Sequence, residues 1–230
     1  MSDRFLNTAQ WLEHPDIWPK REELITNFKD RFVGFGSCFA QNIQQCVQPF
    51  GFEYWYDRNV CAHYSAESMA NVLEIVATGR EMTEDDLIID AVNGGAITSY
   101  PFYFKKRYFG QKGAKHILNR MRSLVDDCRR EIEECTFLVI TLGTARVLRL
   151  LHNGTVLNTA AHIRREYWES EMSSVDDNVR HLNRIYQSVH EIRCGEMPVI
   201  FLTISPQRYL FSADVAGLEV SAGLLVGAGS

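Results

Sequence analysis

The sequence predicts an α/β protein with a three-layer α/β/α architecture, in which a mostly parallel sheet lies between helices. Three apolar runs have the length and composition of buried strands, and they lie near residues 31–37, 136–144 and 198–205. Apolar residues at helical spacing occur between these runs and predict helices at 65–79, 115–135 and 175–194. This alternation of buried strands and helices is typical of a parallel sheet covered on both faces.

The chain before the first strand is expected to form an N-terminal arm over residues 1–30. Two proline-containing turns precede a short amphipathic stretch there. Trp11 and Trp18 are interpreted as anchors packed on the main domain, and a role in ligand binding is the less favoured alternative.

The first strand is followed by a helical pattern, in which Ala40, Ile43, Val47 and Phe50 recur at helical spacing. The aromatic segment 51–56 then predicts a second strand. The helix predicted at 65–79 has polar capping residues at its start and Gly79 as its stop.

The two later helices are also amphipathic. The apolar stripes that we expect to face the core are Ile117, Met121, Leu124, Val125, Cys128 and Ile132 in the first, and Val179, Leu182, Ile185, Tyr186, Val189 and Ile192 in the second. Between these helices, residues 147–158 predict a β-hairpin that turns at Asn153-Gly154.

The composition excludes several classes of protein. A net charge of −5 argues against a surface for nucleic acid or for an anionic membrane. No apolar run is long enough to span a bilayer, and the N-terminus lacks a signal-peptide core, so we expect a cytoplasmic protein. The six cysteines show no metal-site spacing and are expected to be reduced, mostly buried thiols.

The main candidate for a functional residue is Ser37, which lies where the first strand ends and the following helix begins. In open α/β sheets this edge is where ligands bind, and a helix N-terminus offers unpaired N–H groups to an anion. A serine there can be a nucleophile, or it can be a plain N-cap. Local chemistry alone favours the N-cap.

The stretch Gly36-Ser37-Cys38-Phe39-Ala40 is identical to the signature of the GSCFA-domain family, and Thr141-Leu142-Gly143-Thr144 and Ser205-Pro206-Gln207-Arg208 also resemble that family. The resemblance covers about residues 30–210. The family is similar to the SGNH (GDSL-like) hydrolases, so the resemblance implies an SGNH/flavodoxin-like fold with Ser37 as the nucleophile.

The resemblance also implies roles for other residues. Gly36, Gly143 and Thr144 would bind the substrate or its oxyanion, with the backbone N–H groups of Ser37 and Gly143 as donors. Thr144 stands near the place where SGNH hydrolases have an asparagine. His162 is the best histidine candidate for the base, and His63 is interpreted as a loop histidine. Arg208 can hold an anionic substrate group or form a structural ion pair.

The SGNH general base belongs to an Asp-x-x-His segment near the C-terminus, and no such segment occurs here. We therefore expect an N-terminal arm at 1–30, an incomplete GSCFA domain at 31–212 and an atypical tail at 213–230. The expected function is hydrolysis or acyl transfer on a small-molecule or glycan ester, with weak or no activity. The alternative is a non-catalytic acyl- or sugar-binding or scaffold domain. No cofactor is expected, and a metal enzyme is the least favoured class because no ligand cluster occurs.

Overall fold

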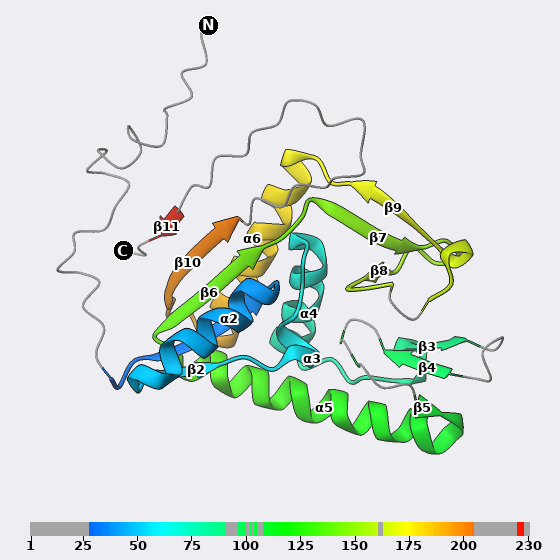
Figure 1. Ribbon diagram of the computed structural model, residues 1–230, viewed down its shortest axis with the longest axis horizontal. Helices are drawn as coiled ribbons and strands as arrows, with labels where there is room; N and C mark the ends of the chain where they lie inside the picture. The colour runs from blue at the N-terminus through cyan, green and yellow to red at the C-terminus, as the bar shows by residue number, and fades with distance from the viewer. Residues whose placement is uncertain are drawn as a thin grey trace, which may run out of the picture.

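A five-stranded sheet forms the centre of the protein in the computed structural model, which describes residues 28–90, 96–99, 102, 104, 108–160, 163–204 and 225–227. The strand order is β11-β10-β6-β1-β2 (Figure 1). The bounds of these strands are Arg31–Gly36 (β1), Glu53–Trp55 (β2), Phe137–Leu142 (β6), Val199–Ile204 (β10) and Leu225–Gly227 (β11). β1 pairs in parallel with β2 and β6, β6 pairs in parallel with β10, and β11 runs antiparallel along β10. The predicted mostly parallel sheet is confirmed.

Helices cover both faces of this sheet, which confirms the three-layer prediction. Helix α2 (Cys38–Val47) crosses in front of the sheet in Figure 1, whereas α6 (Val175–Ile192) runs behind it. Helices α4 (Ala66–Thr78) and α5 (Gly110–Glu134) pack with α6. Alternate strand residues, Val33, Phe35, Leu138 and Ile140 among them, join these three helices in one core.

The other face of the sheet is aromatic. The rings of Phe32 and Phe137 stack with centroids 4.7 Å apart, and Phe137 and Phe201 stack at 5.6 Å. Phe32 also stacks on Tyr54 at 6.3 Å. Because successive strand residues point to opposite faces, these rings lie away from the core shared by α4, α5 and α6.

The helices begin and end largely where the sequence predicts. Ser65 caps α4, because its side chain accepts a hydrogen bond from the Ser68 N–H, and Gly79 ends the helix with a φ of 62°. All six apolar residues predicted for α5 are buried, but α5 begins at Gly110, five residues before the predicted start.

Two small sheets stand outside the central one. The first contains β3 (Leu87–Asp90), β4 (Ala96–Ser99) and β5 (Tyr108–Phe109), and the second contains β7 (Arg146–Leu150), β8 (Val156–Leu157) and β9 (Trp168–Met172). The predicted hairpin is confirmed as β7 and β8, which pair antiparallel. The remaining short elements are α3 (Arg58–Cys61) and the 3₁₀ helices η2 (Gln48–Phe50), η3 (Glu84–Asp86) and η5 (Arg165–Tyr167).

The apolar stripe predicted for α6 is partly wrong. Val179 and Tyr186 are about half exposed, whereas His181 is buried. The reason is a set of polar contacts with α4, in which the Arg184 guanidinium pairs with the Glu74 carboxylate at 2.6 Å. These contacts rotate a charged side of α6 toward α4.

The expectation of mostly buried cysteines is also wrong for half of them. Cys61, Cys128 and Cys135 are buried free thiols, whereas Cys38, Cys46 and Cys194 are exposed. Cys38 and Cys46 lie on α2, in which only Ala40 is buried, so this helix leaves most of its surface open.

We predict that Gly36→Ala strongly destabilises the protein. Gly36 has a φ of +129°, and a Cβ there would overlap the carbonyl and hydroxyl oxygens of Thr141. The expected loss is roughly 2–5 kcal/mol of unfolding free energy. Gly154→Ala is the control, because its φ is +70° but a Cβ meets nothing within 4 Å, so about 1–2 kcal/mol is expected. Urea unfolding of both variants measures the difference, and equal losses would contradict the prediction.

Candidate active site

Ser37 lies where the sequence predicts, directly after β1 and at the N-cap of α2. Its backbone is extended, with φ −68° and ψ −177°, and its Oγ accepts a hydrogen bond from the Phe39 N–H at 3.3 Å. Ser37 is only 2% exposed. The apolar run before it forms the strand, and the helical spacing after it forms the helix, so Ser37 marks the change between the two.

Gly143 lies beside Ser37, as predicted. Residues Gly36 and Thr141 are partners in the parallel pairing of β1 with β6, and β6 ends at Leu142. A Cβ added at Gly143 would lie 3.5 Å from the Ser37 Cβ. The neighbouring Thr144 turns its Oγ1 toward its own chain, where it accepts a hydrogen bond from the Arg146 N–H at 2.9 Å.

The backbone donors expected to be open for an oxyanion are engaged within the protein. The Ser37 N–H donates to the Thr141 Oγ1 at 3.1 Å. The Gly143 and Thr144 N–H groups both donate to the Tyr64 carbonyl oxygen, at 2.9 and 3.0 Å. The roles of Thr141 and Tyr64 as acceptors were not predicted from the sequence, because no local pattern signals either of them.

Tyr56 supports the Gly36-Ser37 junction from another side. Its hydroxyl donates to the Gly36 carbonyl oxygen at 3.3 Å. Burial raises the pKa of Tyr56, so its hydroxyl stays protonated at neutral pH and can act as a hydrogen-bond donor.

His63 is a structural part of the loop before α4. It is fully buried, with its Nδ1 3.2 Å from the Ser68 Oγ and its Nε2 3.1 Å from the Val60 carbonyl oxygen. Both ring nitrogens are therefore occupied, which agrees with the interpretation as a loop histidine. Within the residues that the structure describes, no histidine hydrogen-bonds to Ser37.

Two of the predicted site residues, His162 and Arg208, lie outside the described residues. The described chain continues to Ala160 after β8 and resumes at Ile163, whose N–H donates to the Ala160 carbonyl oxygen at 3.0 Å. The roles predicted for His162 and Arg208 stay predictions.

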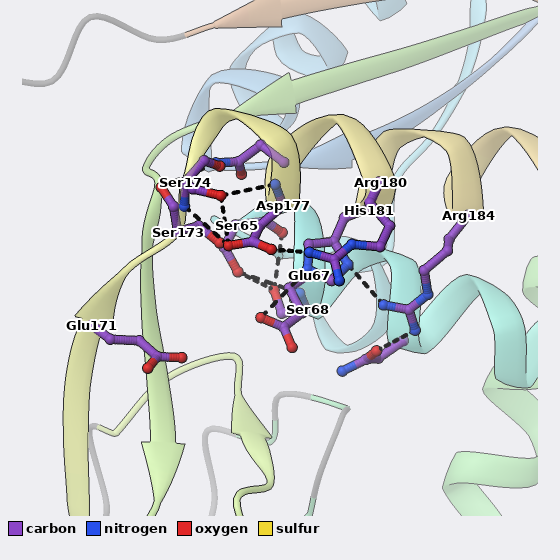
Figure 2. A network of polar contacts seen from close by, with 12 residues as sticks. Ser65, Glu67, Ser68, Glu171, Ser173, Ser174, Asp177, Arg180, His181 and Arg184 are labelled. Carbon is purple, nitrogen blue, oxygen red and sulfur yellow. Dashed lines mark hydrogen bonds and ion pairs between the residues drawn. The ribbon is translucent and has the colours of Figure 1, made fainter.

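A polar cluster fixes the start of α4, where Figure 2 shows Glu67 near His181 of α6. Helix α4 directly follows the loop of Tyr64. The Arg149 Nη2 lies 3.0 and 2.8 Å from the two Glu67 carboxylate oxygens, and the His181 Nε2 lies 3.7 Å from Glu67 Oε2. Arg184 donates to the His181 Nδ1 at 2.8 Å, so His181 carries its proton on Nε2 and is neutral. β7 and α6 therefore both hold α4 in place.

Two features of other protein classes, a metal-ligand cluster and a membrane-spanning helix, are missing from the described residues. Among them, no group of three or more His, Cys, Asp or Glu side chains could hold a metal ion. None of the helices described is both long enough and apolar enough to cross a membrane.

The fold and the site define an α/β protein with a serine at the strand-to-helix junction of a parallel sheet. A family model, described as the GSCFA family, matches residues 31–222. Because this match spans most of the chain, the protein belongs to the GSCFA family. Searches of the curated proteins and of the solved structures find no match to this chain.

Protonation of His63 should destabilise the fold as the pH falls. Burial lowers the pKa of His63 from 6.5 to about 4. Between these values the unfolded chain binds a proton that the folded chain does not, so stability is present above about pH 6.5 and is lost as the pH falls toward 4. His63→Gln removes this contribution.

We expect the drop in unfolding free energy between about pH 7 and about pH 4.5 to be roughly 2–3 kcal/mol larger in the wild type than in His63→Gln. Urea titrations at the two pH values measure this difference. His181, whose pKa burial also lowers, contributes equally to both proteins and cancels. The same drop in both proteins would contradict the assignment.

Proposed function

We propose that this GSCFA-family chain is a serine hydrolase or acyltransferase that acts on an ester, with Ser37 as the nucleophile. The observation that carries the proposal is the position of Ser37 at the carboxyl end of β1, at the N-cap of α2 and beside Gly143. That edge of a parallel sheet is the usual place for a ligand. A helix N-terminus there favours the negative charge that acyl transfer develops.

In the proposed reaction the Ser37 Oγ forms a bond to the ester carbonyl carbon, and the carbonyl electron pair moves to the oxygen. His162 takes the serine proton as general base. The tetrahedral intermediate then expels the alcohol oxygen, which receives that proton from His162. Water or an acceptor alcohol attacks the acyl-serine in the second half of the reaction.

The substrate class that we propose is a small or glycan-borne ester, such as an O-acetyl group. The family resemblance supports this class. Phe39 is 48% exposed and lies two residues from Ser37, so its ring can pack on the face of a sugar beside the serine. Arg208 is the proposed contact for an anionic group on the substrate.

A non-catalytic acyl- or sugar-binding domain is the second candidate. It is favoured by one observation, namely that the Ser37 hydroxyl meets no base among the described residues. A serine without a base is a poor nucleophile at neutral pH. In that case the Ser37 hydroxyl would serve only as an N-cap and a ligand contact.

We predict that hydrolysis of a small aryl acetate depends on Ser37. Ser37→Ala should lower kcat by at least about 100-fold, and His162→Ala should lower it by roughly 100- to 10,000-fold. Initial rates of phenolate release from the wild type and the two variants measure this dependence.

Ser174→Ala is the matched control, because Ser174 also caps a helix through its side chain but stands at the start of α6. Removing either cap should destabilise its helix by about 1 kcal/mol, so stability alone will not separate the two variants. Turnover that survives Ser37→Ala would exclude Ser37 as the nucleophile and favour the binding domain.

A further inference from the structure

The two backbone donors that the family resemblance implies for an oxyanion, the N–H groups of Ser37 and Gly143, already hydrogen-bond within the protein, as does the neighbouring Thr144 N–H. Thr141 holds the Ser37 N–H, and the Tyr64 carbonyl holds those of Gly143 and Thr144. The Tyr64 loop is fixed by the buried His63 next to it, so freeing Gly143 requires a well-anchored loop to move. In this arrangement another donor must stabilise a negative oxygen at Ser37.

Among the backbone N–H groups at the strand-to-helix junction, that of Cys38 is the donor that remains. Within the part of the chain that the structure describes, it donates to no acceptor, whereas the N–H groups on either side are engaged by Thr141 Oγ1 and Ser37 Oγ. It belongs to the peptide that directly follows Ser37, and it opens a helix of ten residues. The Cys38 N–H therefore lies at the positive end of the α2 dipole.

The serine side chain can make one further hydrogen bond at this place. Ser37 is 2% exposed, and its Oγ accepts from Phe39 but donates its own hydrogen to no acceptor among the described residues. The Oγ is therefore satisfied as an acceptor, and its hydrogen remains available to a further acceptor. A base or a ligand beside the Ser37 Oγ would satisfy this hydrogen.

We infer that the backbone N–H of Cys38 is the principal oxyanion donor, while the N–H groups of Gly143 and Thr144 serve to hold the Tyr64 loop. This inference rests on the proposed function. As the Ser37 Oγ bonds to the ester carbon, the carbonyl oxygen becomes negative and accepts from the Cys38 N–H. In hydrolases with a nucleophile at a sharp strand-to-helix turn, the N–H of the residue after the nucleophile has this role.

Proline at position 38 removes this donor without breaking the helix. Cys38 is the first residue of α2, a position where proline is favoured because its N–H has no partner in the helix. Ser37 is extended, which is the conformation that a residue before proline prefers. We expect the kcat of Cys38→Pro to be roughly 100- to 1000-fold below that of Cys38→Ala, with little change in KM.

Val175→Pro is the control for proline at a first helical position. Val175 is the first residue of α6, which is not the helix that Ser37 caps, and its side chain is 79% exposed. It should keep the kcat of the wild type. Equal kcat values for Cys38→Pro and Cys38→Ala would overturn the inference.

A second measurement tests the role of the Cys38 N–H without relying on turnover. In ¹⁵N-labelled wild type and Ser37→Ala, titration with acetate, the anion that acetyl-ester hydrolysis releases, should shift the Cys38 amide more than those of Gly143 and Thr144. A larger shift at Gly143 or Thr144, or no shift at any of the three, would overturn the inference. If the wild type hydrolyses no aryl acetate but the Cys38 amide responds, the proposed function fails and the Cys38 anion site stands. If Cys38→Pro fails to fold, the titration still tests the inference.

Discussion

The close parallel pairing of β1 with β6 determines where the candidate site lies. Gly36 and Thr141 face each other across these strands, and the space that a Gly36 side chain would fill is taken by the Thr141 oxygens. Because Gly36 has no side chain, the Thr141 Oγ1 comes within 3.1 Å of the Ser37 nitrogen. The same contact sets the direction of the Ser37 backbone and hence the first turn of α2.

The end of β6 is also held in place by the loop that precedes α4. The Tyr64 carbonyl joins the end of β6 to the loop before α4, and the start of α4 is held by Arg149 through Glu67. This ion pair is partly buried, so removing a single partner leaves an uncompensated charge and destabilises more than the pair itself contributes. The candidate site is therefore anchored to β6 and to the start of α4.

The sequence predicted β1, β2, β6, β10 and the long helices well because their signals are local: apolar period, a serine cap and a terminal glycine. It did not predict β11, which lies in the segment expected to be an atypical tail. It could not predict the rotation of α6, because the pairing of Arg184 with Glu74 is a long-range contact that overrides the apolar stripe. It missed β9, whose residues Trp168–Met172 are mostly polar and form a strand only through pairing with β7. The engaged state of the Gly143 N–H was equally hidden, since Tyr64 accepts through its main chain, which side-chain identity does not reveal.

The two interpretations of Ser37, helix cap and nucleophile, are compatible in this geometry because they use different N–H groups. The cap uses the Phe39 N–H and contributes about 1 kcal/mol to stability. One oxyanion donor is worth roughly 3–4 kcal/mol in the transition state of serine enzymes, so losing the cap during reaction is the smaller effect. A general base adds a further 100- to 10,000-fold, or roughly 3–5 kcal/mol. The cap therefore does not by itself exclude the proposed nucleophilic role of Ser37. The presence or absence of a base at the Ser37 Oγ decides between an enzyme and a binding domain.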